Sequence, residues 1–231
     1  MFKNLVMNKI YYLTISLFIT LNVFAQTDRQ QWDPVSGNLL FYHQAEKIDG
    51  SPFLKDKWED ASVVLEKGYT FKHVSLKFDI YNNVFVFNRH DTAYELGNYV
   101  AEVQFFPNSP DSTQKLVFRK GYSVSNSISN TKFLQVLAEG KLTLLKYYQK
   151  ETEEYTEYGN AVKFKRFNDK ETYYVLKDGQ YKLVNLSKKN LENLLQLQYG
   201  KVEAFLKAKD LSGKDEDGWV AAINYSNSLI P

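Results

Sequence analysis

A strict alternation of apolar and polar residues constrains the fold of this chain more than any other feature. It is clearest in HVSLKFDIYNNVFVFN, residues 73–88. The apolar members of the alternation are Val74, Leu76, Phe78 and Ile80. A period of two residues is that of a β-strand with one buried face. Asn82 and Asn83, which tolerate positive φ, separate this run from a second apolar run, VFVF, so the segment predicts a β-hairpin.

The same signals recur along the chain and predict an antiparallel sheet. FLQVLAEGKLTLLKYY (residues 133–148) predicts a hairpin with its turn at Glu139-Gly140. Residues 162–185 predict a meander of three strands, divided by Asn168-Asp169 and Asp178-Gly179. YVAEVQFF and QKLVFRKGY add two strands around a polar loop. We expect eight to ten strands before residue 186, and seventeen Tyr and sixteen Phe agree with a β-rich chain.

The period changes from strand to helix at Ser187. This residue predicts a helix N-cap, with Leu186 and Leu191 placed as a hydrophobic staple. Helical spacing recurs at Tyr199, Val202, Phe205 and Leu206, and again at Trp219, Ala222, Ile223 and Ser226. The predicted fold is therefore α+β, mainly antiparallel β, capped by about three short C-terminal helices. These helices are too short to be stable alone, so residues 187–231 should pack on the β domain.

The first 25 residues predict a signal peptide. A short basic region precedes the apolar run IYYLTISLFITLNVFA, and Val23 and Ala25 supply the small residues that signal peptidase needs. Polar residues interrupt the run, which is shorter than the roughly 20 residues of a membrane-spanning helix. We expect cleavage before Gln26, export across the inner membrane, and a periplasmic or extracellular mature chain without a membrane span. The mature β domain would then cover residues 26–186.

Composition excludes several chemistries. The chain has 29 basic and 27 acidic residues, and Lys3 and Lys9 of the leader account for the difference, so the mature chain has no net charge to attract nucleic acid. It has no cysteine, which excludes disulfides, thiol nucleophiles and thiolate metal sites. The histidines His43, His73 and His90 lack the spacing of a metal motif, and no nucleotide-binding loop is present, so we expect neither metal nor cofactor.

The segment IDGSPFLKDKWEDASVVLEKG (residues 48–68) predicts a structural corner at the entrance to the first strand. Gly50 permits a sharp turn, and Pro52 biases the preceding residue towards extended geometry. Phe53, Leu54 and Trp58 should then lie under the sheet, before a strand that begins with SVVLEKG.

These segments resemble an uncharacterised family of small secreted β-rich proteins of Bacteroidota that have a helical C-terminal tail. The resemblance rests on GSPFL, LKFDIYNNVFVF, FLQVLAEGKLTLL, and the tail from LSKKNLENLL to AAINYSNSL. It implies a secreted compartment and a β-rich fold, but no activity and no functional residue.

Two segments are weak candidates for a binding site. NRHDTAYE groups Arg89, His90 and Asp91 after a strand, where a histidine beside a carboxylate can do acid–base work. YYQKETEEYTEYG offers Tyr155 and Tyr158 as an aromatic platform for a glycan or peptide. A solvated turn and an ordinary strand surface are the simpler interpretations of the two segments.

Two other motifs point to no site. GYSVS lacks the second glycine of a nucleophile elbow, and GKDEDG lacks the glutamate of an EF-hand, so a helix start lined with acids explains it better.

The sequence therefore predicts no catalytic residue and favours a non-enzymatic envelope or extracellular module that binds a partner protein or a glycan. The alternative is a metal-independent hydrolase that uses carboxylates. An enzyme should bring two carboxylates together in a concave pocket, whereas a binding module should present an exposed aromatic strip or an open sheet edge.

Overall fold

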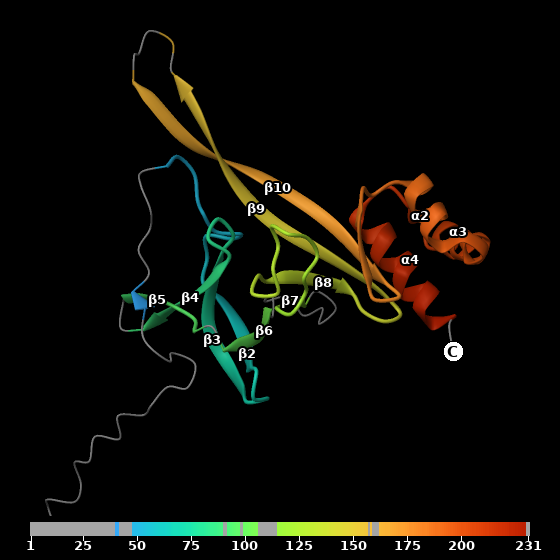
Figure 1. Cartoon of the computed structure of the whole chain (residues 1–231), viewed down its shortest axis with the longest axis horizontal. Coiled ribbons are helices and arrows are strands. Elements are labelled where there is room, and N and C mark those ends of the chain that lie inside the picture. The colour runs from blue at the N-terminus through green and yellow to red at the C-terminus, as the bar shows by residue number, and fades with distance from the viewer. Residues whose placement is uncertain are drawn as a thin grey trace, which may run out of the picture. The chain divides into compact units, whose positions relative to one another are not determined.

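The computed structural model describes residues 40–41, 48–89, 92–97, 99–105, 115–156, 158 and 162–229, and its centre is one mainly antiparallel sheet (Figure 1). The sheet contains ten strands of four or more residues and the two-residue β1. The strands are β1 (Leu40–Phe41), β2 (Glu59–Leu65), β3 (Thr70–Asp79), β4 (Val84–Arg89), β5 (Thr92–Glu95), β6 (Val100–Phe105), β7 (Leu116–Arg119), β8 (Leu134–Ala138), β9 (Leu142–Thr156), β10 (Lys163–Lys177) and β11 (Gln180–Val184). Their order is β1-β5-β4-β3-β2-β6-β7-β8-β9-β10-β11. Two meanders, β2–β5 and β6–β11, are thus joined where β6 pairs with β2.

The predicted hairpins around Asn83, Gly140 and Gly179 are confirmed. Asp79 pairs with Val84 across the first turn, and Asn83 there has a φ of 59°. β8 and β9 flank the second turn. The third is a two-residue turn in which Asp178 and Gly179 both have positive φ, as a tight hairpin requires.

The sheet is rolled. The evidence is that aromatic rings contact one another although they lie on strands far apart in the strand order. Phe78 of β3 and Phe118 of β7 lie three strands apart, a separation of about 14 Å in a flat sheet. Their ring centroids are 4.8 Å apart. Phe85 of β4 is one strand further away, yet its ring lies 5.7 Å from that of Phe118 and 4.8 Å from that of Phe133. The rolled face therefore encloses an aromatic core, in which Leu76, Phe78 and Ile80 are buried as the alternation predicted.

The helical tail holds α2 (Lys188–Leu195), the 3-10 turn η1 (Gln196–Gln198), α3 (Tyr199–Ala208) and α4 (Glu216–Ser228). The predicted count of about three separate helices is not matched. α2, η1 and α3 follow one another without a loop, with a break at Gln196 (φ 49°), so the tail forms two helical stretches, 188–208 and 216–228. No helix in the described part of the chain is long and apolar enough to span a bilayer.

Both predicted helix starts are confirmed. Ser187 accepts a hydrogen bond from the Asn190 backbone N–H, and Asp215 accepts one from Gly218, which lowers the pKa of Asp215. The acidic segment GKDEDG is therefore a capped helix start, as the sequence predicted.

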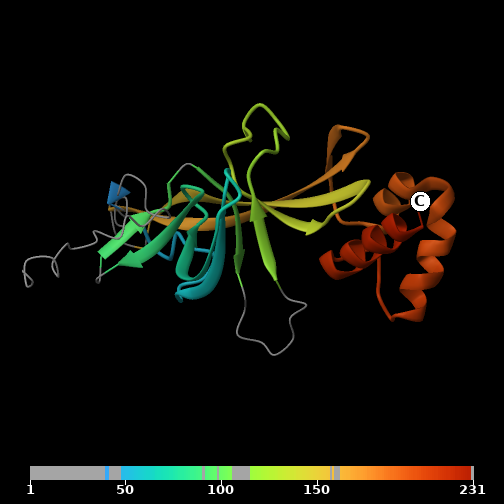
Figure 2. The same cartoon turned by 90° about the horizontal axis from the view of Figure 1, so that it is seen from below.

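The helices lie beside the end of the sheet that holds β8–β11 (Figure 2), and their apolar side chains form a second core with these strands. This second core joins strand residues to the helices through the fully buried Trp219, whose indole N–H donates to the Gly213 carbonyl. The strand members are Ala138, Leu142, Leu144, Val175 and Val184. A third, smaller cluster lies under the loop of residues 120–133, around Leu134, Leu145 and Tyr147. The predicted boundary between the β domain and the helical cap, at residues 186 and 187, stays a prediction.

Two sequence predictions about strands are wrong. Asn168-Asp169 does not form a turn, because β10 continues through both residues and pairs with β9 along its whole length. Cross-strand partners accommodate the pair: Asp169 binds Lys150, and Asn168 donates to Glu153. Trp58 does not lie under the sheet. It directly precedes β2 in the phase opposite to the buried Ala61, and its side chain is 38% exposed beside Lys77.

The corner at residues 48–54 has the structural role that the sequence predicted. Gly50 has a φ of 95°, and Leu54 packs against the aromatic core. The Asp49 backbone N–H and carbonyl both bond to β10, while the Leu54 N–H donates to Phe78 of β3. The corner thus ties β10 to β3, two strands that are far apart in the sheet order.

Candidate functional site

The predicted site residues that the structure describes come from different elements of the sheet. Arg89 ends β4, whereas Tyr155 lies on β9 and Tyr158 in the connection to β10. His90 and Asp91 lie outside the described residues. Among the described residues no group of three or more His, Cys, Asp or Glu side chains could hold a metal ion.

Tyr155 is engaged within the molecule rather than presented as a platform. Its hydroxyl donates to the Asp49 carboxylate. Its ring lies 5.7 Å from the ring of its cross-strand partner Phe164, and the Arg166 guanidinium lies 5.4 Å from the ring centre. Tyr158, in contrast, is fully exposed. Of the two predicted tyrosines, one is therefore structural and one is accessible.

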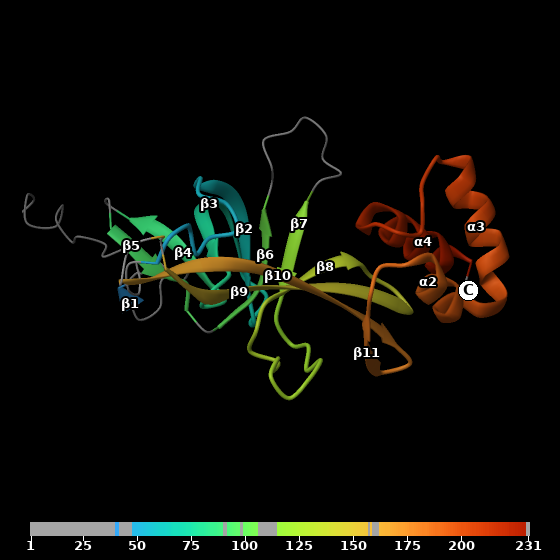
Figure 3. The ribbon, with the colours of Figure 1, turned by 90° about the horizontal axis from the view of Figure 1, so that it is seen from above.

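β9 and β10 form a long ribbon that extends past both of its neighbours (Figure 3). The two strands pair from Leu142–Lys177 to Thr156–Lys163, a ladder of 15 residues on each strand. β8 pairs with β9 only as far as Lys146, and β11 pairs with β10 only from Tyr173 onward. Within the described residues, no strand pairs with residues 147–154 on the side of β9 that faces away from β10. This open edge of β9 is the first candidate site.

Charged side chains line the ribbon in cross-strand pairs. The ion pairs are Lys150–Asp169 (2.8 Å), Lys170–Glu151 (2.7 Å), Arg166–Glu153 (2.9 Å) and Lys163–Glu154 (2.9 Å). The bond from Lys163 lowers the pKa of Glu154, so this carboxylate stays ionised. Exposed pairs add little stability, but they hold the two strands in register and keep the ribbon polar.

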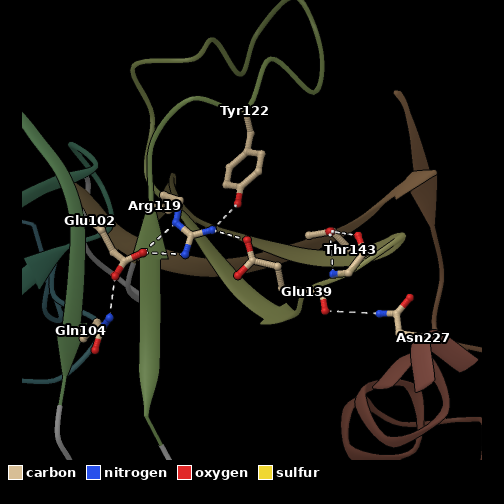
Figure 4. Close-up of polar contacts among 8 residues, drawn as sticks. Glu102, Gln104, Arg119, Tyr122, Glu139, Thr143 and Asn227 are labelled. Atoms are coloured by element: carbon tan, nitrogen blue, oxygen red, sulfur yellow. Dashed lines mark hydrogen bonds and ion pairs between the residues drawn. The ribbon is translucent and has the colours of Figure 1, made fainter. Parts of the chain in front are cut away.

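A second polar cluster is centred on Arg119 of β7 (Figure 4). Its guanidinium donates to Glu102 on β6 (2.7 Å), to Glu139 in the β8–β9 turn (2.5 Å) and to the Tyr122 hydroxyl (3.2 Å). Gln104 donates in turn to Glu102. Burial acts to lower the pKa of Arg119, but the bonds to Glu139 and Glu102 outweigh it and raise the pKa.

The Arg119 cluster is built to join elements rather than to react. Its guanidinium lies between the two carboxylates, so neither faces the other. Asn227 of α4 fixes the turn that carries Glu139: its side-chain amide donates to the Glu139 carbonyl (3.4 Å, Figure 4). The same side chain bonds to both the N–H and the carbonyl of Leu142. A Cβ at Gly140 would come within 2.5 Å of the Asn227 side chain, so a larger residue would displace the amide that fixes the turn.

A third cluster surrounds Lys146, the one lysine in the described residues that is buried as a whole residue. Lys146 Nζ lies 2.9 Å from Glu171 of β10 and 2.9 Å from Glu216 of α4. It also lies 4.6 Å from the ring centre of Tyr148. Burial acts to lower the pKa of Lys146, but the hydrogen bonds to Glu216 and Glu171 outweigh it, so the pKa lies above its ordinary value.

Tyr173 completes the Lys146 cluster. Its hydroxyl donates to Glu216 (2.8 Å), with Glu171 3.1 Å away. Burial and the bond to Glu216 raise the pKa of Tyr173, so the phenol stays protonated. Because both carboxylate oxygens lie 2.9 Å from one nitrogen, they are at most about 6 Å apart, close to a glycosidase pair. The ammonium that fills the space between them leaves no room for a glycosidic oxygen.

Sequence reasoning missed the Lys146 cluster, although one signal was present. In FLQVLAEGKLTLLKYY, Lys146 occupies the same strand phase as Leu142 and Leu144, which are buried. A charged side chain on the buried face of a strand needs a partner that bonds to it. The sequence did not show that this partner would come from Glu216, 70 residues further along the chain.

His73 is the remaining titratable candidate. It lies at a bulge between β2 and β3 with a φ of 59°, and its Nδ1 lies 3.2 Å from Asp60. Its side chain is 85% exposed. With this geometry described, comparison with protein families, with curated proteins and with solved structures finds no match for the chain.

Proposed function

We propose that this chain is an exported, non-enzymatic module that binds a partner protein, and that the partner adds an extended segment as a further strand along β9. The observation that carries the proposal is the open edge of residues 147–154. Strand addition uses the backbone N–H and C=O groups of such an edge for affinity and the alternating side chains for specificity.

The ribbon supports this function because its geometry is already set before binding. β10 pairs with β9 along the whole segment, and the cross-strand ion pairs fix the register. The corner at Asp49 holds β10 through two backbone hydrogen bonds, from Asp49 to Lys165 (2.8 Å) and from Phe167 to Asp49 (3.1 Å). An incoming strand therefore need not order its receptor, which lowers the entropy cost of binding.

The charge of the open edge indicates the chemistry of the partner. Residues 147–154 contain Glu151, Glu153 and Glu154 but only one lysine, Lys150. The three glutamates are exposed, so their outer oxygens can accept further hydrogen bonds. The partner segment should accordingly be extended and basic, with lysines or arginines at alternate positions.

A protein partner has more support than a glycan. Glycan binding needs accessible aromatic faces, but one face of Tyr155 is lined by Phe164 and Arg166, and its hydroxyl is bonded to Asp49. Tyr158 alone is accessible of the two tyrosines that the sequence singled out. One exposed ring is a weak sugar platform, whereas an open strand edge suits a peptide segment directly.

The alternative of a metal-independent hydrolase has less support. The two carboxylate pairs described above, Glu102 with Glu139 and Glu171 with Glu216, are each bridged by a cation. A general acid must carry a proton and face its substrate, and both tasks are opposed by a bridging Arg119 or Lys146.

Export itself rests on the leader of residues 1–25, and a periplasmic or extracellular location belongs to the same proposal. So does the resemblance to the Bacteroidota family.

A photocrosslinking experiment followed by a charge exchange tests the proposal. A photoreactive residue at Thr152 on β9 should capture an envelope protein in intact cells, and one at Asn224 on α4 serves as the matched control. The captured protein is then purified, and its affinity is measured for the parent chain and for the double variant Glu151→Lys with Lys170→Glu. The exchange keeps the ion pair between residues 151 and 170 but reverses the sign of the charge at position 151 on β9.

We expect the affinity for the captured partner to fall at least about tenfold in the double variant, with unchanged thermal unfolding. Equal capture from Thr152 and Asn224, or unchanged affinity after the charge exchange, would contradict the proposal.

A further inference from the structure

The backbone groups that point outward from the open edge of β9 belong to its even-numbered residues. In the two-residue turn at residues 178–179, the flanking residues Lys177 and Gln180 bond to each other, as a tight hairpin requires. Successive residues of a strand bond alternately to the neighbour on one side and the neighbour on the other. Leu176 therefore bonds to β9, where its partner is Thr143. The same alternation along the ladder directs the odd-numbered residues of β9 to β10 and the even-numbered ones away from it.

Two further contacts have the same phase. Lys146, an even-numbered residue, pairs with Gln135 of β8 on the outer side of β9. On the outer side of β10, Asp49 bonds to the Lys165 carbonyl and to the Phe167 N–H. The β9 residues opposite these two are residues 154 and 152, both even-numbered. Residues that lie opposite each other in an antiparallel pair either bond to each other or both point away, so the three observations agree.

β8 stops where its next residue is already bonded. Continuing the register of Gln135 with Lys146 by two residues would place Phe133 opposite Tyr148. The Asn83 side chain instead donates to the Phe133 carbonyl (3.0 Å) and accepts from the Phe133 N–H (2.8 Å), so this N–H is not available to β9. Within the described residues, four residues of β9 keep outward backbone groups without a hydrogen bond: Tyr148, Lys150, Thr152 and Glu154.

One face of the open edge carries a ladder of charges that ends at β9. Glu151 and Glu153 lie on this face, as odd-numbered residues. Glu151 uses only Oε1, towards Lys170 (2.7 Å), and Glu153 uses only Oε2, towards Arg166 (2.9 Å) and Asn168 (3.1 Å). In the described part of the chain, the second oxygen of each carboxylate accepts no hydrogen bond. Basic side chains on an added strand would bond to these oxygens and continue the alternation of charge across three strands.

The other face of the open edge offers aromatic rings. Tyr148 and Thr152 lie on this face, and Phe167 of β10 is the cross-strand partner of Thr152. The Tyr148 ring lies 6.1 Å from the ring of Phe118 in the aromatic core. The Phe167 ring lies 5.2 Å from that of Tyr81, which is 38% exposed. Apolar side chains of an added strand would therefore have apolar neighbours on this face.

We propose that the partner segment is an amphipathic strand that runs antiparallel to β9, in line with β8. Its basic residues lie opposite Glu151 and Glu153, and the apolar residues between them lie on the face of Tyr148 and Thr152. The inference rests on the function proposed above and specifies the partner: the N–H groups of its apolar residues bond to β9, and those of its basic residues point outward. A second copy of this edge does not fit, because it would bring carboxylates against carboxylates.

Calorimetric titration of the mature chain with synthetic peptides tests the alternation. The probe is a capped peptide, as long as the open edge, in which lysine and valine alternate. The control has the same composition but carries its lysines and its valines in two separate blocks. The alternating peptide should bind at least about tenfold more tightly than the control. Amide chemical shifts of β9 should change at the four outward-facing residues.

Backbone methylation of the alternating peptide tests its register. Methyl groups on the valine nitrogens should weaken binding at least about tenfold, because these N–H groups bond to β9. Methyl groups on the lysine nitrogens should change the affinity by less than about threefold, because these N–H groups point away from β9. A nitroxide label at the peptide N-terminus tests its direction, since it should broaden the amide signal of Glu154 more than that of Tyr148.

A charge variant tests the face that carries the lysines. Glu153→Gln should weaken binding of the alternating peptide about 3- to 10-fold. Glu192→Gln, at an exposed position on α2, is the matched control and should leave the affinity unchanged.

Four results would overturn the inference. They are affinities weaker than about 1 mM for the alternating peptide, equal binding of the alternating and block peptides, a larger loss from lysine than from valine methylation, or stronger broadening at Tyr148 than at Glu154. If a photoreactive residue at Thr152 still captures a partner that Asn224 does not, any of these results leaves strand addition standing and refutes only the partner pattern. Equal capture at the two positions refutes the proposed function itself.

Discussion

The hydrogen bonds of Asn83 should be among the most costly to remove in this chain, because they join two segments that are distant in sequence. The Asn83 side chain donates to the Phe133 carbonyl (3.0 Å) and accepts from the Phe133 N–H (2.8 Å). Both residues are buried, with Asn83 6% exposed. The Phe133 ring packs edge-on against Phe85, so the two hydrogen bonds also fix one wall of the aromatic core.

The expected loss follows from what each substitution leaves behind. Asn83→Gly keeps the positive φ of 59° but leaves the N–H and carbonyl of Phe133 unpaired. A buried unpaired polar group costs about 1–3 kcal/mol, so for the two groups we expect a loss of about 2–6 kcal/mol in the free energy of unfolding. Asn83→Ala should cost about 1 kcal/mol more, because a Cβ disfavours the left-handed conformation.

Urea unfolding of the mature chain, followed by tyrosine and tryptophan fluorescence, measures both values. Asn88→Ala is the matched control, since Asn88 is exposed on β4 and should change stability by no more than about 0.5 kcal/mol. A loss below about 1 kcal/mol in Asn83→Gly would show that water replaces the side chain at no cost. The reasoning that these two buried hydrogen bonds are costly to remove would then be wrong.

Four other outcomes are expected. Phe78→Ala should cost about 3–5 kcal/mol in the same assay, since Phe78 is buried against Phe85 and Phe118, and a loss under about 1 kcal/mol would contradict its core position. Stability should fall as pH rises above about 10, because folding raises the pKa of Lys146 and Tyr173 above their unfolded values and so favours their protonated forms. The variant Lys146→Met should make that fall in stability shallower. Ending the chain after residue 185 should cause aggregation or loss of cooperative melting, because the strand side of the second core would be exposed; an unchanged melting temperature would contradict this. Mass spectrometry of the exported protein should find Gln26 at the N-terminus, and an intact leader would refute the predicted cleavage.

The parts of the fold that could be predicted are those set by neighbouring residues. Strand alternation and the turns at Asn83, Gly140 and Gly179 are local, so each hairpin could be read from about 15 residues. The caps at Ser187 and Asp215 are local in the same way. The turn predicted at residues 168–169 failed because the signal was local, whereas the cause of the extended strand was cross-strand pairing with β9.

The sites could not be predicted because they assemble from distant segments. The open edge of β9 exists only because β8 and β11 stop short of the end of the ribbon. The pairing of β2 with β6, which joins the two meanders, follows no turn signal in the sequence either. Arg89 was chosen for its place after a strand, but nothing in that pattern shows which other strands come near.

Lys146 also has a role that its position in β9 explains. Leu144, Lys146 and Tyr148 lie on one face of the strand, and they contact in turn the helical core, Glu216 and the aromatic core. Leu145 and Tyr147 lie on the opposite face, in the cluster under the 120–133 loop. A shift of β9 by one residue would therefore move the ammonium into that apolar cluster and leave Glu216 without its cation. An unpaired buried charge is far more costly than a displaced leucine, so the Lys146 cluster excludes the shifted pairing. A buried ammonium thereby fixes the register of the strand that both larger cores share.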